Sequence, residues 1–215
     1  MSENDAYQAL HGRIVAGELS PGERLVEEEL AEQLGESRGS IRTALLRLEH
    51  DGLVLRERNR GARVRRVTAE EAVEILEARA ALESLAAGHA AERRSDEEVE
   101  ELRAIVAEMR ALHAAGELLA MSERNAAMHR RILEISRHAV ARDICARLNS
   151  QIVRFQFRTV LAPGRSTRSL EEHTAIIDAI AVGDRDAAEA TMRTHLSHVA
   201  QTLLSTQPSG TSQAM

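Results

Sequence analysis

The sequence predicts a mainly α-helical protein: an N-terminal helix-turn-helix with a β-hairpin, followed by an all-α antiparallel bundle of helices. Three observations predict this fold class. Aromatic residues make up only 1% of the 215 residues, so the cores must be built from aliphatic side chains and methionine, which favours packed helices over sheets. Apolar residues recur at helical spacing along most of the chain. Glycines and a proline–glycine pair interrupt this spacing, which indicates short links between helices.

The N-terminal part of the chain contains three short helical patterns. Ser20-Pro21-Gly22 is a turn between the first and the second, and Gly35 ends the second. Ser37 is placed to cap the third, which ends near Gly52. The predicted helices are 5–17, 27–34 and 38–51. Two short helices joined by a turn that contains glycine have the dimensions of a helix-turn-helix.

After Gly52 the pattern changes from helical to extended. Two short apolar and arginine-containing segments, 53–56 and 62–66, flank Asn59-Arg60-Gly61. This arrangement predicts a two-stranded hairpin with a basic tip, which is the wing of a winged helix.

From Thr68 onward the chain is helical in period. Serine or threonine is followed three residues later by glutamate at Thr68, Ser95 and Ser169, the spacing of a capping box at a helix start. The predicted helices are 69–92, 96–114, 117–135, 139–161, 169–182 and 185–205. We therefore predict a winged helix-turn-helix domain in residues 1–67, an all-helical domain in residues 68–205 and a disordered tail in residues 206–215.

The charge of the chain is unevenly distributed. The net charge is −6, which by itself argues against nucleic-acid binding. Residues 1–37 hold nine acidic residues and two arginines, whereas residues 38–66 hold nine arginines and three acidic residues. A short basic segment in an acidic protein is what a localised phosphate-binding surface requires.

Other features place the protein in the cytoplasm. A single cysteine, Cys145, allows no internal disulfide, and its helical setting favours a small buried apolar side chain over a redox role. The acidic N-terminus is not a secretory signal, and no apolar stretch is long enough to span a bilayer, so no membrane partner is expected.

Residues 14–64 resemble the DNA-binding domain of the GntR family of bacterial regulators. The matching residues are Ile14, Gly17, Leu19, Pro21-Gly22-Glu23-Arg24-Leu25, Glu28, Leu30-Ala31, Leu34-Gly35, Ser37-Arg38, Ile41-Arg42, Ala44-Leu45, Leu48, Gly52-Leu53-Val54, Gly61 and Val64. The chain departs from the family pattern at Glu36, where an apolar residue is usual, and at Gly39-Ser40, where proline is usual before the apolar residue.

The resemblance implies that Ser37, Arg38, Gly39 and Arg42 are the DNA contacts of the recognition helix, and that Gly61 lets the wing tip approach the minor groove. Arg38 and Arg42 are four residues apart, so both project from one helix face. Free N–H groups at the start of that helix also favour phosphate. Arg47 and Arg60 flank the same surface and are expected to contact phosphates. The alternative is that these arginines only solvate a helix face.

A second group of polar residues lies in the helical domain. Asn125 and His129 are four apart on one helix, and His173 and His195 reach similar heights if the last two helices form an antiparallel hairpin. Three imidazoles and one oxygen could bind a divalent metal, although histidines of a helical bundle also occur without a function.

Residues 70–205 resemble the FCD ligand-binding domain of the FadR branch of GntR regulators. The matching stretches are Glu77-Ala78-Arg79, Leu82-Glu83, Asn125-Ala126-Ala127-Met128-His129, Glu172-His173, Ile176, Ala179-Ile180 and Met192-Arg193-Thr194-His195-Leu196. The resemblance implies that Asn125, His129, His173 and His195 bind a divalent metal, commonly zinc or nickel. Asn125 is neutral where many members have aspartate.

The resemblance also implies a small carboxylate effector. Arg79 matches an arginine that faces the effector cavity, and Arg154 and Arg158 lie four apart on the helix bordering it. Each could bind a carboxylate in a bidentate manner. Surface pairing, such as Arg79 with Glu83, is the alternative.

Together these features predict a transcriptional regulator, with repression the expected sign, that binds near-palindromic double-stranded operator DNA as a homodimer under the control of the effector. One alternative keeps the regulator without the metal, with arginines binding the effector directly. A more remote alternative is a metal-dependent hydrolase, but the sequence contains none of the common hydrolase motifs and nothing that acts as a general base beside Asn125.

Overall fold

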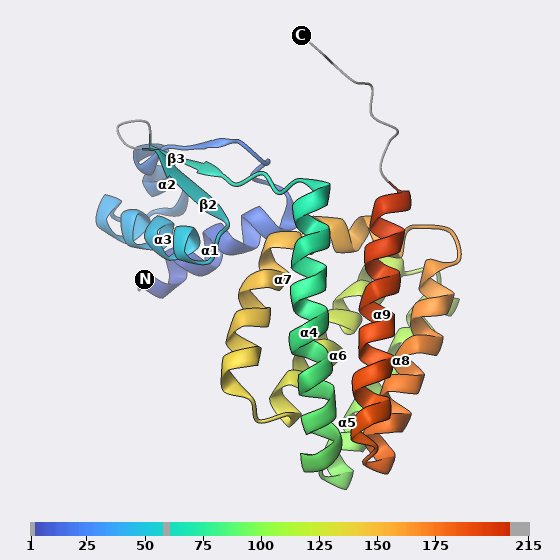
Figure 1. Ribbon diagram of the computed structural model, residues 1–215. Helices are drawn as coiled ribbons and strands as arrows, with labels where there is room; N and C mark the ends of the chain where they lie inside the picture. Colours follow the sequence, from blue (N-terminus) through green and yellow to red (C-terminus); the bar gives the residue numbers. More distant parts are fainter. Residues whose placement is uncertain (1–2, 58–60, 207–215) are drawn as a thin grey trace. The chain divides into compact units, whose positions relative to one another are not determined.

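The computed structural model describes residues 3–57 and 61–206, with the side chains of residues 3, 4, 57, 153, 154 and 156–158 outside the description. Within these ranges the chain forms nine helices and one three-stranded sheet (Figure 1), which confirms the mainly α-helical fold class. Two compact units are distinguished. The first is built on the residues up to Thr68 together with Asn149–Arg154, and the second on Ala69–Leu148 together with the described residues from Phe155 onward.

The first unit contains three helices and a small antiparallel sheet. Its elements are α1 (Glu3–Ala16), β1 (Arg24–Leu25), α2 (Glu27–Leu34), α3 (Arg38–His50), β2 (Val54–Glu57) and β3 (Gly61–Val64). The predicted hairpin of β2 and β3 is present, but the sheet has a third strand, because β1 pairs with the other side of β3. Strand β1 was not predicted, since a two-residue strand is too short to show an alternating pattern.

The turn between α2 and α3 follows the predicted capping residues. Gly35 has a φ of 65°, a left-handed conformation that glycine adopts without strain, and it ends α2. The Ser37 side chain accepts a hydrogen bond from the Ser40 backbone N–H and begins α3. Ile41, Leu45 and Leu48 point from α3 into the core of this unit and are almost fully buried. Burial of this face turns the opposite face of α3 toward solvent.

The second unit is built from six helices. They are α4 (Ala69–Arg93), α5 (Asp96–Ala114), α6 (Leu118–Ile135), α7 (Ala139–Val160), α8 (Arg165–Val182) and α9 (Arg185–Ser205). One of them, α7, also supplies Asn149–Arg154 to the first unit. Figure 1 shows α4 and α9 lying side by side over most of their lengths, and α8 packs on α9. Buried alanines line the inner face of α4, among them Ala86, Ala87 and Ala90. Their small side chains let the neighbouring helix approach closely.

The predicted starts of two bundle helices had different outcomes. The capping box of Ser95 and Glu98 is present at the start of α5. The predicted start of α8 at Ser169 was wrong, because the helix already begins at Arg165, after Gly164 in a left-handed conformation. The capping-box spacing of three residues is also one turn of a continuous helix, and here Glu172 turns inward to bind other side chains.

No helix in the described ranges is both long enough and apolar enough to cross a membrane.

Cys145 is expected to be unreactive in the folded protein. Its side chain is completely buried in α7. Burial, together with the charge of Glu83, raises the pKa of the thiol to about 12, so the reactive thiolate is scarce near neutral pH. A disulfide reagent such as dithionitrobenzoate should therefore label the chain at pH 8 only after urea is added. Labelling in native buffer at the rate of the unfolded chain would contradict this.

Candidate functional site

The start of α3 presents the predicted recognition residues to solvent. Ser37, Arg38, Gly39 and Arg42 are all exposed. Ser37 is the N-terminal cap, and its hydroxyl also lies 2.9 Å from the Ser40 hydroxyl. The cap orients the first turn of α3, so Arg38 and Arg42 leave the helix on the same exposed side.

Both of these arginines are paired with acidic residues that the sequence analysis did not assign. Arg42 donates from Nε and Nη2 to the Glu27 carboxylate, with the shortest distance 2.8 Å. Arg38 donates from Nη2 to Glu28. Both acidic residues belong to the first turn of α2, where the positive end of the helix dipole stabilises carboxylates. The run of three glutamates at 27–29 could have indicated ion pairs with α3. Which arginines these glutamates contact depends on how α2 and α3 pack together.

Arg47 lies in a different environment from the other two arginines of α3. Its guanidinium carbon is 4.1 Å from the centre of the Tyr7 ring, a cation–π arrangement. The Tyr7 hydroxyl donates a hydrogen bond of 2.7 Å to Asp51. Burial, then the hydrogen bond to Asp51, raises the pKa of Tyr7 to about 12. These contacts join α1 to the end of α3.

The wing is described up to its tip. Gly61 is the first residue of β3, is exposed and has a φ of 85°, a conformation that favours glycine. Arg60, the other predicted wing contact, lies outside the described residues.

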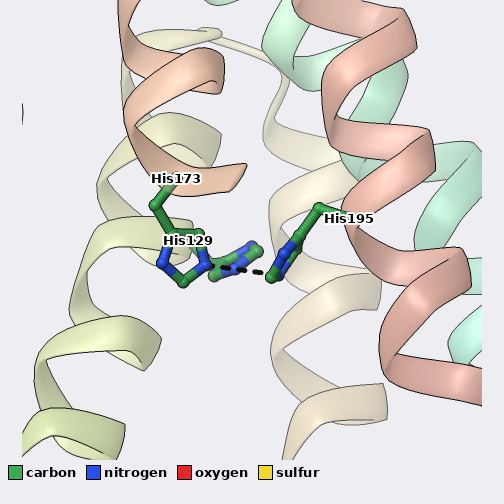
Figure 2. Close-up of side chains that lie close together, drawn as sticks. All are labelled: His129, His173 and His195. Atoms are coloured by element: carbon green, nitrogen blue, oxygen red, sulfur yellow. Dashed lines mark hydrogen bonds between the residues drawn. The ribbon is translucent and has the colours of Figure 1, made fainter. Parts of the chain in front are cut away.

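Three of the four predicted metal-binding residues come together in the second unit. His129 of α6, His173 of α8 and His195 of α9 point toward one another (Figure 2), and one ligand atom from each lies within 4.8 Å of the others. His173 Nε2 and His195 Nε2 are 3.2 Å apart. All three side chains are buried.

Two carboxylates orient the outer nitrogens of these histidines. Glu83 of α4 accepts a hydrogen bond from His129 Nδ1 at 2.6 Å, and Glu172 of α8 accepts one from His195 Nδ1 at 2.7 Å. Each contact leaves Nε2 of that ring facing the cluster. A carboxylate behind a metal-binding imidazole fixes its tautomer and increases its basicity. Both glutamates lie in stretches that carried the FCD resemblance, but their role was missed.

The protonation of the cluster favours a bound cation. Burial lowers the pKa of His173, and the neighbouring His195 and His129 lower it further. Burial, then His129 and Arg165, lowers the pKa of His195. These rings are therefore neutral near pH 7 and present lone pairs to one another.

Two buried polar atoms of the site lack hydrogen-bond partners in the described part of the chain: Asn125 Oδ1 and His173 Nδ1. Leaving a buried polar atom without a partner costs about 1–3 kcal/mol. Neutral imidazole nitrogens and an amide oxygen are ligands for zinc, nickel and similar divalent ions. The residues present therefore fit a divalent metal.

A pocket lies beside the histidines. The space between its lining side chains is about 460 Å³, part of it open to solvent. Its lining includes Asn125, His129, His195, Thr159 and two buried arginines, Arg79 and Arg165.

The two pocket arginines are both held by carboxylates of the site. Arg79 pairs with Glu83 at 2.7 Å, so the alternative of a surface pair was wrong about its location: both side chains are buried. Arg165 donates to Glu172 at 2.9 Å. Arg165 was not among the predicted site residues, because the predicted helix began only at Ser169 and left Arg165 in a loop. The side chains of Arg154 and Arg158 lie outside the described residues.

Two family models match the chain. The model for bacterial regulatory proteins of the gntR family matches residues 3–64, and the model for the FCD domain matches residues 74–198.

Individual proteins match over most of the chain. The Nta operon transcriptional regulator of Aminobacter aminovorans is 30% identical, with 85% of each chain covered. The HTH-type transcriptional regulator LutR of Bacillus subtilis is 28% identical, with 87% of this chain and 94% of LutR covered. The structure of McbR/YncC from E. coli has the same fold, with a TM-score of 0.80, 21% identity and coverage of 95% of this chain and 98% of that chain. These domains and relatives are those of DNA-binding transcriptional regulators and not of enzymes.

Proposed function

The chain belongs to the GntR family of bacterial transcriptional regulators, with a C-terminal FCD domain, and on this basis we propose that a small carboxylate bound beside a divalent metal in α4–α9 controls its affinity for operator DNA. The observation that carries the proposal is the convergence of three buried histidines next to a pocket that contains two arginines.

The DNA-binding surface is assigned to the exposed start of α3 and to the wing. Arg38 and Arg42 enter the major groove, and Ser37 and the N-terminal N–H groups of α3 contact phosphate. Gly39 lies between Arg38 and Arg42 and lets the start of α3 approach the DNA backbone. Gly61 and Arg60 of the wing approach the minor groove. Arg47 contacts phosphate from the far end of α3.

The metal is assigned to Asn125, His129, His173 and His195. When bound, the ion supplies a positive centre that attracts a carboxylate oxygen. Glu83 and Glu172 keep the histidine rings oriented toward it. An aspartate at position 125 would neutralise part of the charge of the cation. Asn125 is neutral, so more of that positive charge remains, which favours an anionic effector.

Arg79 and Arg165 are assigned to the other end of the effector. Both line the pocket and are held in place by carboxylates, Arg79 by the buried Glu83 and Arg165 by Glu172, so their remaining N–H donors are oriented before the ligand arrives. Sugar acids, lactate-like hydroxy acids, dicarboxylates and amino acids all present the required carboxylate.

The regulator is expected to act in the cytoplasm as a two-fold dimer on a near-palindromic operator, with repression as the expected sign. The effector acts only through different affinities for the DNA-binding and the non-binding arrangement of the dimer.

Replacing Arg42 with alanine tests the DNA-binding surface. We expect salt-dependent binding of the wild-type protein to a duplex spanning the region upstream of its own gene, and roughly 5-fold to 150-fold weaker binding of Arg42→Ala. Gel-shift titration at two salt concentrations measures both.

Arg103→Ala is the matched control, because Arg103 is an exposed arginine that pairs with Glu100 on α5. If Arg42→Ala bound the duplex as tightly as the wild-type protein, Arg42 would not belong to the DNA-binding surface. Absence of salt-dependent binding by the wild-type protein would overturn the proposed function.

A further inference from the structure

The contact between Arg42 and Glu27 has a defined geometry. Arg42 Nε lies 3.2 and 3.3 Å from the two carboxylate oxygens, and Nη2 lies 2.8 Å from one of them. The carboxylate therefore meets the guanidinium from the side, along its Nε edge. The Glu27 side chain is 30% exposed, less than half of the 61% of Arg42, so the acid is the better anchored of the two.

Side-on pairing leaves the end-on edge of the exposed Arg42 guanidinium unoccupied by Glu27. A guanidinium has five N–H donors in one plane. Glu27 uses the Nε–H and one hydrogen of Nη2, so the adjacent end-on edge, formed by Nη1 and the second hydrogen of Nη2, has no hydrogen bond to Glu27. Two parallel N–H groups on one edge are what the O6 and N7 acceptors of guanine require.

The neighbouring pair differs from this arrangement. Arg38 contacts Glu28 through a single nitrogen, Nη2. Both side chains of that pair are highly exposed, 63% for Arg38 and 70% for Glu28. Exposed pairs of this kind restrict the side chains little, because rotamer entropy opposes them. The two glutamates therefore carry the same charge at adjacent positions, but only Glu27 holds an arginine along an edge.

We propose that Glu27 is a positioning residue for base recognition: it fixes the guanidinium of Arg42 so that its end-on edge reads a guanine in the major groove. This inference rests on the proposed DNA-binding function. It adds that the discrimination between base pairs at the position read by Arg42 depends on a residue of α2.

The charge of Glu27 and its positioning act in opposite directions on DNA binding. The hydrogen bonds from Arg42 hold the pKa of Glu27 below its ordinary value, so the residue is a carboxylate near neutral pH. A carboxylate close to the DNA repels phosphates and lowers affinity for any sequence. Removing it should raise affinity for unrelated DNA while base discrimination falls. A substitution that only disturbed the fold would lower both.

The experiment measures a binding profile in which each base pair of the footprinted upstream duplex is changed in turn. Wild-type protein, Arg42→Ala, Glu27→Gln, Glu27→Asp and Glu28→Gln are compared, with an unrelated duplex of equal length for affinity without specificity. Glu27→Asp keeps the charge but is one methylene shorter, and Glu28→Gln removes an adjacent charge without an edge contact. Thermal melting shows that each variant is folded.

The wild-type protein should discriminate by roughly 5-fold to 150-fold at the base pair that loses its preference in Arg42→Ala. At that same base pair, we expect Glu27→Gln and Glu27→Asp to discriminate between bases at least ~5-fold less than the wild-type protein. Glu28→Gln should keep the wild-type profile. Glu27→Gln should also bind the unrelated duplex more tightly than wild type.

Two results would overturn the inference while leaving the proposed function in place. One is a wild-type profile in both Glu27 variants. The other is an equal rise in affinity for all duplexes in Glu27→Gln and Glu28→Gln, with Glu27→Asp unchanged, which would reduce Glu27 to a repulsive charge. If Arg42→Ala itself alters no position, the assignment of Arg42 fails first, and this inference fails with it.

Discussion

Replacing Glu83 with alanine is expected to lower the free energy of unfolding by about 3–5 kcal/mol. Glu83 is 1% exposed and accepts hydrogen bonds from Arg79 and from His129, which are also buried. Alanine would leave the Arg79 guanidinium buried without its counter-charge, and removing one partner of a buried pair costs more than the pair contributes. Urea denaturation followed by circular dichroism measures the change.

The pH dependence of stability gives an independent check on Glu83. Burial alone would raise its pKa, but the charges of Arg79 and His129 together lower it from 4.5 to about 2. A group whose pKa is lower in the folded state stabilises the fold above its unfolded pKa. The contribution should thus be present above about pH 4.5 and lost as the pH falls toward 2. This part of the acid dependence should be missing in Glu83→Ala.

Glu100→Ala is the matched control for this prediction. Glu100 also pairs with an arginine, Arg103, but its side chain is 70% exposed. We expect little change in unfolding free energy there, because exposed pairs contribute little. A loss in Glu83→Ala no larger than in Glu100→Ala would contradict the view that Glu83 supports the site from within the core.

Removing divalent metal is expected to lower the melting temperature by several degrees. An ion present at one hundred times its dissociation constant stabilises the state that binds it by about 2.7 kcal/mol. For a chain of this size that corresponds to roughly 5–10 °C. The physical source is the set of histidine nitrogens that face one another, together with the buried Asn125 Oδ1, which has no hydrogen-bond partner in the described part of the chain. Differential scanning fluorimetry after chelation, with zinc or nickel then added back, measures the shift, and elemental analysis measures the bound metal.

His195→Ala should abolish the shift caused by added metal, whereas His89→Gln should retain it, since His89 pairs with Glu92 outside the cluster. The same assay separates the two effector models. If small carboxylates raise the melting temperature only in metal-loaded protein, the ion takes part in effector binding. If they do so equally after chelation, arginines bind the effector directly. An identical response of wild type and His195→Ala to added metal would remove the metal site.

The sequence predicted most helices closely because helix signals are local. The α2 boundaries at 27–34 and the α9 boundaries at 185–205 agree with the structure, since glycines or a capping residue stand beside them. The start of α8 was wrong because one spacing, that of Ser169 and Glu172, describes both a capping box and a turn inside a helix. Strand β1 was missed because its two residues are extended only through pairing with β3.

For the candidate site too, local motifs identified individual residues, whereas their contacts depend on the tertiary structure. Motif resemblance pointed to His129, His173 and His195, and the structure brings them together. It could not assign partners to these residues. His129 and Glu83 are 46 positions apart, and His195 and Glu172 are 23 apart.

By itself, then, the sequence determined the fold class, the family resemblance and the candidate ligand set, because periodicity, caps and motifs are properties of short stretches of chain. Only the tertiary structure decided which carboxylate lies behind each histidine, which glutamate holds Arg42 and where Arg165 points. Those contacts depend on the crossing angle, rotation and register of packed helices. These quantities are set by the whole core, and no short stretch of residues encodes them.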